Sequence, residues 1–351
     1  MVTIGVDCHK RSHSLVAVDG NGRQLAEKTV EASDAGHLQA VAWGREWQQR
    51  VWALENCRHV SRRLEADLLR AGEQVLQVSP KLMAGARRTA QTAGKSDPID
   101  ALAVARAALR EPGLPVARLE GASREVRLLV DHREDLVAER TRCQNRLHWS
   151  LLELVPEFEQ GLAAGALSSF RTLDEIEARL AGAAGVEVDV ARVLVAQIRW
   201  LTKQANALEK EIARRTAELV PTLLAMPGCG ALTAGKILGE VADVSRFRSR
   251  AAFARQNGTA PIPVWSGDSQ QVRLNRGGNR QLNAALHRIA ITQLRLRGPG
   301  WEYHQKCLAG KTTKKGALRL LRRRLSNQVY RRLLLDERAR QATTAGPRIA
   351  A

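Results

Sequence analysis

The fold of the first part of the chain is set by residues 2–30, VTIGVDCHKRSHSLVAVDGNGRQLAEKTV. This stretch contains three short runs of β-forming residues, at 2–8, 13–18 and 24–30. The second and third runs are separated by DGNG (19–22), a strong hairpin turn signal. The sequence therefore predicts an N-terminal meander of three strands.

Helices and strands alternate in the residues that follow, which is typical of an α/β domain. A further helix begins at SDP (96–98), because proline suits the first turn of a helix, and continues through IDALAVARAAL (99–109). Pro112 and Pro115 close this domain. The elements expected before that helix are, in order, a helix at about 34–48, a strand at 51–55, a helix at about 59–71 and a strand at 73–79.

The middle of the chain is helical. Residues from about 122 to 160 and from about 172 to 220 are rich in leucine, arginine and glutamate, with apolar positions every three to four residues. Gly/Ala-rich breaks lie at 161–165 and 182–185. This pattern predicts two long amphipathic helices that form a helical hairpin or a short coiled coil.

The last part of the chain begins with the turn MPGCG (226–230), followed by a helix over 231–241. The turn suits a helix-hairpin-helix device, in which backbone amides face a phosphate, and it suits a tight helix-helix corner equally well. Residues 257–280 are rich in Gly, Pro, Ser and Asn and predict a long functional loop. Helices at about 280–297 and 313–335 complete a mainly helical domain.

The charge balance points to a polyanionic partner. The 351 residues carry 55 Lys and Arg against 36 Asp and Glu, a net charge of +19. Between Arg273 and Arg340 alone we count 18 basic against 3 acidic residues. A solvated helix face normally mixes the two signs, so this excess favours nucleic acid as the partner.

The cysteine content and the hydropathy of the sequence indicate the cellular location. The five cysteines are scattered and never form a CxxC pair, so neither a disulfide framework nor a zinc site of the usual spacing is indicated. No apolar run approaches the roughly 20 residues that span a bilayer, and residues 1–15 lack a signal-peptide core. We therefore expect a cytoplasmic protein with reduced thiols and no membrane partner.

Four carboxylates stand where they can converge. Asp7 lies near the end of the first predicted strand and Glu55 ends the fourth. Asp97 and Asp100 open a helix with the i, i+3 spacing that places both side chains on one side. Carboxylate oxygens are the ligands that Mg²⁺ prefers, and this order of acids is that of a ribonuclease H-like site. Read alone, Asp97 has a simpler alternative role as the N-cap of its helix.

Three segments that carry these acids resemble the carboxylate motifs of DEDD-type transposases from bacterial insertion sequences. They are IGVDCHK (4–10), ALEN (53–56) and GKSDPIDA (94–101). The family is the insertion-sequence-110 family, to which the Piv-type invertases are related. Two later segments, MPGCGALTAGKILGEVADVSRFRSRAAFARQNGTAPIP (226–263) and WSGDSQQVRLNRGGNRQLNAAL (265–286), resemble the second transposase domain of that family.

The resemblance implies a domain organisation and an activity. It implies a ribonuclease H-like α/β domain over 1–115, a helical hairpin or coiled-coil connection over 116–220 and a mainly α transposase domain over 221–340. We expect residues 341–351 to form a flexible tail. The implied enzyme is a DNA transposase or site-specific recombinase. It is expected in the bacterial cytoplasm, associated with the nucleoid. It acts on donor and target DNA as a homodimer or homotetramer, uses Mg²⁺ or Mn²⁺, and is guided by a structured bridge RNA.

Site residues follow from the same resemblance. The metal-binding and catalytic acids are Asp7, Glu55, Asp97 and Asp100, and the serine nucleophile is Ser266, with Ser269 as the fallback. Without the resemblance, Ser266 suits an ordinary turn residue. The basic residues expected to bind nucleic acid are Arg273, Arg276, Arg280, Lys311, Lys314, Lys315, Arg319, Arg322, Arg323 and Arg324.

Several residues keep two interpretations. Trp265 and Trp301 suit stacking on bases, or core packing. Cys8, His9, Cys57 and His59 depart from the usual motif and suit a transition metal weakly and core packing better. For the whole chain, the alternatives are a Holliday-junction resolvase-like nuclease that uses water instead of serine, and a non-enzymatic basic protein that binds nucleic acid.

Overall fold

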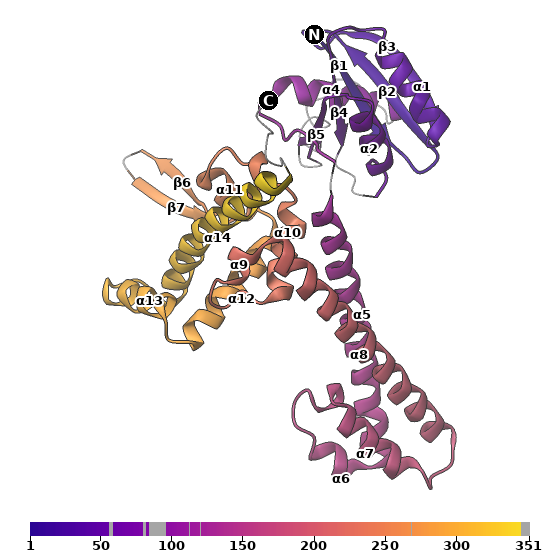
Figure 1. The fold of residues 1–351 in the computed structure, drawn as a ribbon, viewed down its shortest axis with the longest axis vertical. Coiled ribbons are helices and arrows are strands. Elements are labelled where there is room, and N and C mark those ends of the chain that lie inside the picture. Colours follow the sequence, from indigo (N-terminus) through magenta and orange to yellow (C-terminus); the bar gives the residue numbers. More distant parts are fainter. Residues whose placement is uncertain are drawn as a thin grey trace, which may run out of the picture. The chain divides into compact units, whose positions relative to one another are not determined.

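The computed structural model describes residues 1–55, 59–79, 82–83, 96–111, 113–119, 121–267 and 269–344. The chain folds into two compact units, Met1–Glu120 and Gly121–Ala351 (Figure 1). The four-part division expected from the sequence is finer and stays a prediction.

The first unit is built on a five-stranded mixed sheet with the strand order β3-β2-β1-β4-β5. Strand β2 pairs antiparallel with both β1 and β3, whereas β4 runs parallel to β1 and β5 parallel to β4. The N-terminal meander is thus confirmed. The strands are β1 (Val2–Cys8), β2 (Ser12–Val18), β3 (Gln24–Glu31), β4 (Arg50–Glu55) and β5 (Val75–Val78).

Helices cover both faces of this sheet, so its central strands are buried on both sides. Helices α1 (Asp34–Gly44) and α2 (Arg62–Arg70) pack on the face that carries Ile4 and Val6 of β1. Helix α4 (Asp97–Arg110) packs on the opposite face, against β1, β2 and β4. The alternation of helices and strands predicted an α/β domain, and this arrangement confirms it.

Gly5 allows α4 to lie unusually close to β1. A Cβ atom at this position would stand 2.2 Å from the carbonyl oxygen of Ala101 and 2.5 Å from the backbone nitrogen of Ala105. Only a glycine beneath two alanines leaves room for such contact. The close packing fixes where the first turn of α4 lies relative to β1.

The second unit begins with two long helices that lie side by side, α5 (Ala122–Leu154) and α8 (Val186–Leu219) (Figure 1). Contacts tie them along their length, including the ion pair between Arg133 and Glu209 at 2.6 Å. The prediction of two long helices is confirmed, but the sequence missed a small helical cap between them. That cap consists of α6 (Pro156–Gln160), the 3₁₀ helix η1 (Ala166–Ser168) and α7 (Phe170–Leu180).

The rest of the second unit is a mainly helical domain around one apolar core. Compared with the sequence prediction, α13 is an additional helix and α14 runs nine residues further, to Thr344. No helix in the described part of the chain combines the length and apolarity needed to cross a membrane. The helices are α9 (Pro221–Leu224), α10 (Ala231–Val241), η2 (Val244–Arg246), α11 (Arg250–Gln256), α12 (Arg280–Arg295), α13 (Pro299–Ala309) and α14 (Lys314–Thr344).

The expectation of a long loop over 257–280 is wrong for most of its length. Strands β6 (Pro261–Ser266) and β7 (Ser269–Leu274) pair there as an antiparallel hairpin. Prolines concealed it, because proline normally argues against a strand. Pro261 and Pro263 are two residues apart, so the missing N–H groups of both lie on the free edge of the two-stranded ribbon.

Candidate active site

Asp7 belongs to the face of the sheet that α4 covers. Side chains alternate along β1, so Ile4, Val6 and Cys8 enter the core beneath α1 and α2 while Gly5 and Asp7 face α4. Asp7 is 7% exposed. It therefore presents a mostly buried carboxylate at the end of β1, beside the start of α4.

The first turn of α4 adds two more acids. Asp100 is buried, at 7% exposure, and Asp97 is exposed. Ser96 is the N-cap residue of α4, so Asp97 is the first residue of the helix. The alternative interpretation of Asp97 as the N-cap is therefore wrong. Both aspartates are close enough to Asp7 to raise the pKa of that carboxyl group.

Glu55 lies beside Asp7 on the neighbouring strand. In the parallel pairing of β1 with β4, Val6 is opposite Leu54, so the next residue on each strand is Asp7 and Glu55. Ala53 packs against α4 through Val104 and Ala107, and alternation places Glu55 on the same face. The sheet and α4 therefore bring all four predicted acids to one end of one face.

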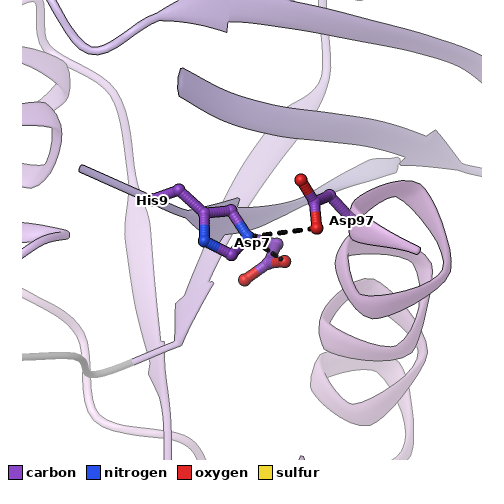
Figure 2. A group of neighbouring side chains, drawn as sticks. All are labelled: Asp7, His9 and Asp97. Carbon is purple, nitrogen blue, oxygen red and sulfur yellow. Dashed lines mark hydrogen bonds and ion pairs between the residues drawn. The ribbon is translucent and has the colours of Figure 1, made fainter. Parts of the chain in front are cut away.

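His9 also belongs to this group, as Figure 2 shows. Its Nε2 atom lies 2.9 Å from Oδ2 of Asp7 and 3.3 Å from Oδ1 of Asp97. From sequence alone, His9 was only a member of the weakly supported cluster of Cys8, His9, Cys57 and His59. The available signal was its position two residues after Asp7, which places both side chains on one face of an extended chain.

The electrostatics of the site suit a divalent cation. Burial raises the pKa of Asp7; the hydrogen bond and charge of His9 lower it, and the charges of Asp100 and Asp97 raise it further. Burial and neighbouring negative charges both disfavour an ionised carboxylate. A cation with a preference for oxygen ligands relieves both costs, so this donor set fits Mg²⁺ or Mn²⁺.

The described members of the candidate transition-metal cluster, which was Cys8, His9, Cys57 and His59, lie in different environments. Cys8 packs in the core beneath α1 and α2, on the face opposite to Asp7. His59 is exposed, and His9 contacts the aspartates. Cys57 lies outside the described residues, as do Asn56 of the ALEN motif and residues 94–95 of GKSDPIDA.

Ser266 lies in the second unit, at the end of β6, where it pairs with Ser269 across the turn of the hairpin. Both serines are exposed, and Gly267 between them has a positive φ of 56°. Trp265 precedes Ser266 and is 69% exposed, so the core-packing alternative for this residue is wrong. The hairpin therefore presents a hydroxyl and an indole to solvent.

The base of the hairpin is held tightly. A Cβ atom on Gly278 would stand 2.3 Å from the backbone nitrogen of Gly258, so the two ends of the hairpin segment touch through glycines. The amide of Asn279 donates to the carbonyl of Gln256 at 2.6 Å, and its side-chain oxygen caps α12. These contacts fix the direction in which the strands leave the domain.

The turn at 226–230 packs against α12. Gln293 donates from Nε2 to the carbonyl oxygen of Pro227 at 2.8 Å, and a Cβ atom on Gly228 would stand 3.1 Å from the carbonyl oxygen of Ile289. This is the geometry of a tight helix-helix corner. The phosphate-binding alternative for this turn stays a prediction.

The predicted basic residues fall into two groups. Arg322 and Arg323 are partly buried and donate to Asn283 and Asn327, and Arg324 lies 4.6 Å from the centre of the Tyr303 ring. The first group is Arg322 and Arg323, whose hydrogen bonds lie within the second unit. The second group is exposed and consists of Arg273, Arg276, Arg280, Lys311, Lys314, Lys315, Arg319 and Arg324.

Comparison with known families places both halves of the chain among transposases. Residues 4–156 match the DEDD transposase model named for IS110, and residues 220–305 match the transposase model of the IS116/IS110/IS902 family. Together the two matches cover more than half of the chain. They include Asp7, Glu55, Asp97, Asp100 and Ser266.

Relatives align over most of their length. The uncharacterized 44.8 kDa protein of insertion element IS116 from Streptomyces clavuligerus is 25% identical, covering 87% of this chain and 88% of the relative. The transposase for insertion sequence element IS1328 from Yersinia enterocolitica is 25% identical over 82% of both chains. Among solved structures, T. thermophilus RuvC in complex with a Holliday junction substrate is 16% identical, with a TM-score of 0.25 over 31% of this chain and 93% of that chain.

Proposed function

Because the chain belongs to the IS110 family of DEDD transposases, and is thus an enzyme that acts on DNA, we propose a specific division of labour between its two units. The four carboxylates of the first unit hold a divalent cation, and Ser266 of the second unit is the nucleophile. The observation that carries the proposal is the convergence of Asp7, Asp97 and Asp100 where β1 ends and α4 begins.

Each acid has a part in this proposal. Asp7, buried beneath α4, and Asp100 are the inner ligands, and the exposed Asp97 stands on the solvent side, where a phosphate arrives. Glu55 completes the set from the neighbouring strand. A cation held there neutralises charge that develops on the phosphate during phosphoryl transfer.

Ser266 performs the cleavage step. Its Oγ forms a bond to the DNA phosphorus as the bond from phosphorus to the leaving DNA oxygen breaks; the serine proton goes to a base, and the leaving oxygen gains a proton. The resulting phosphoserine diester keeps one phosphate ester bond for each bond broken, so reversal rejoins DNA without an external energy source.

The hairpin supports this role by its exposure. Ser266 stands at its end, Trp265 offers an exposed indole for stacking on a base, and Arg273 on β7 adds positive charge nearby. The exposed basic residues of the second unit then contact the phosphates of DNA and of a structured guide RNA. An assembly of two or four chains brings donor and target together.

A covalent adduct tests the proposal. We expect wild-type protein with Mg²⁺ to form a DNA-linked species on a nicked substrate that carries the element's end, and peptide mapping to place the phosphodiester on Ser266. Ser266→Ala should abolish the adduct, whereas the matched Ser269→Ala, across the same turn, should keep it. An adduct on Ser269 would move the nucleophile by three residues.

The same experiment separates the second candidate function. A metal-dependent nuclease that uses water cleaves DNA without any protein adduct, and its cleavage survives Ser266→Ala. The presence of all four acids favours this nuclease over a non-enzymatic protein that only binds nucleic acid and would leave DNA uncut. Normal recombination by Asp7→Asn, Glu55→Gln and Asp97→Asn would show that the metal site is wrongly assigned.

A further inference from the structure

The proposed function gives no role to His9, although His9 is the third member of the group around Asp7 and Asp97 (Figure 2). The backbone explains its position. The amide of His9 donates to the carbonyl of Ser12 at 3.0 Å, which extends the pairing of β1 with β2 by one residue. Alternation then directs His9, like Asp7, to the side of α4.

The distances are those of donor atoms around a single ion. Nε2 of His9 lies 2.9 Å from an oxygen of Asp7 and 3.3 Å from an oxygen of Asp97, and all three atoms lie within 4.8 Å of one another. Two donors bound at right angles to one cation, with bonds of about 2.1 Å, are about 3 Å apart. The three side chains therefore need little rearrangement to share a cation.

The group is also accessible. The side chains of His9 and Asp97 are 47% and 53% exposed, whereas that of Asp7 is 10% exposed. A cation can therefore enter from solvent and reach the buried carboxylate last. A neutral imidazole with its proton on Nδ1 offers the lone pair of Nε2 to that cation.

We propose that His9 is a ligand of the divalent cation at this site, and that it makes the site bind transition-metal cations more tightly than Mg²⁺. The inference rests on the proposed carboxylate metal site. Imidazole nitrogen is a favoured ligand of first-row transition metals, whereas Mg²⁺ prefers oxygen ligands alone. His9 therefore increases the affinity of the site for transition-metal cations and changes its affinity for Mg²⁺ little.

The test uses Co²⁺, whose visible absorption reports its ligands, with the full-length protein and Mg²⁺ as competitor. We expect His9→Ala to weaken Co²⁺ binding roughly tenfold or more and to change Mg²⁺ binding less than about threefold. His148→Ala is the matched control, because His148 is also a part-exposed histidine next to a carboxylate, Glu159 at 3.1 Å. It should bind both metals as wild type does.

Two further variants make the outcome decisive. His9→Asn keeps a hydrogen-bond donor beside Asp7 but has no imidazole. It should lose Co²⁺ affinity as His9→Ala does. Wild-type Co²⁺ affinity in either variant would overturn the role of His9. Asp7→Asn should lose both metals. If Asp7→Asn retains them, the proposed metal site itself is wrong, whereas loss in Asp7→Asn with full retention in His9→Ala refutes only the inference about His9.

Discussion

Two histidines of the first unit, His13 and His37, form a buried pair. Their Nε2 atoms are 3.1 Å apart, and Nδ1 of His37 lies 2.6 Å from a carboxylate oxygen of Asp67. If Nδ1 of His37 donates to Asp67, its Nε2 accepts from His13 in the neutral pair. Among the described residues, Nδ1 of His13 then has no hydrogen-bond partner, so a proton there is poorly accommodated.

We expect His13 to make the first unit sensitive to acid. Burial, with smaller contributions from His37, His9 and Arg63, lowers the pKa of His13 to about 4. The unfolded chain takes up this proton near pH 6.5 and the folded chain only near pH 4, so stability falls as the pH drops through that window. We expect a loss of roughly 1–2 kcal/mol between pH 7 and pH 5, allowing for solvent screening.

Urea unfolding at pH 7 and pH 5 measures this effect. His13→Gln, which cannot take up a proton, should show a smaller loss of stability than wild type over the same interval. His59→Gln, at an exposed histidine of the same unit, should behave as wild type does. An equal pH dependence in wild type and His13→Gln would show that other groups carry the acid sensitivity.

At the scale of elements, the packing of α4 on β1 positions the acids. The contact depends on Gly5, above which the backbone of α4 passes without room for a side chain. We expect Gly5→Ala to destabilise the protein by about 1–3 kcal/mol, because α4 must move outward. The same movement separates Asp97 and Asp100 from Asp7, so metal affinity should fall as well.

Thermal unfolding and Co²⁺ titration together check this expectation. Gly20→Ala is the matched control, because a Cβ atom there meets nothing within 4 Å. A Gly5→Ala protein with reduced stability but wild-type metal affinity would show that the packing supports only the fold.

Helix α14 begins with charges of the unfavourable sign. Lys314 and Lys315 occupy its first turn, which contains no acid, although the N-terminus of a helix favours anions. Both are exposed, whereas Arg322 and Arg323 further along donate to asparagines within the unit. The two lysines do not stabilise the start of the helix, so binding of a polyanion at this end would explain their presence.

We expect Lys314→Gln with Lys315→Gln to leave stability equal or slightly higher, and to weaken DNA binding. If both lysines contact phosphates, the dependence of log affinity on log salt should flatten by up to about 1.8. The control pair Lys203→Gln and Lys210→Gln removes two exposed lysines from α8 and should leave the slope unchanged. An unaltered slope for Lys314 and Lys315 would remove this end of α14 from the interface.

Sequence reasoning succeeded where one pattern dominated locally. The turn DGNG predicted the meander, and the residues around Pro98 predicted the helix whose first turn contains Asp97 and Asp100. It failed where tertiary contacts decide. The β6–β7 hairpin contains two prolines, and its base depends on contact between Gly258 and Gly278, which no local pattern reveals.

The site itself was predictable only in part. The candidate acids could be read from sequence motifs, but the closeness of His9 to Asp97 depends on the packing of α4 over β1. Likewise, Arg322 and Arg323 belong to a segment with the composition of a phosphate-binding surface, and only the fold shows that they are partly buried and donate to asparagines. Charge counts identify a basic segment without distinguishing its structural from its exposed members.

The proposed reaction needs groups from two separate units of the chain. The acids belong to Met1–Glu120 and Ser266 to Gly121–Ala351. An exposed serine is a weak nucleophile at neutral pH and needs activation by the metal or by a base. Complete sites therefore form either within one chain or between chains of an oligomer, and the two arrangements predict different results when inactive variants are mixed.

We expect the site to form between chains. Asp7→Asn retains only the serine and Ser266→Ala retains only the acids, so each should be inactive alone, whereas a mixture assembles one intact site per mixed dimer. Random exchange in a symmetric dimer makes about a quarter of all sites intact, which sets the upper limit of recovered cleavage. The adduct must then form on the Asp7→Asn chain, because it alone keeps Ser266, and a size tag on that chain makes the product visible on a gel. Co-purification of the untagged chain with the tagged chain confirms that the chains exchange, and no adduct in the mixture despite such exchange would place acids and serine within one chain.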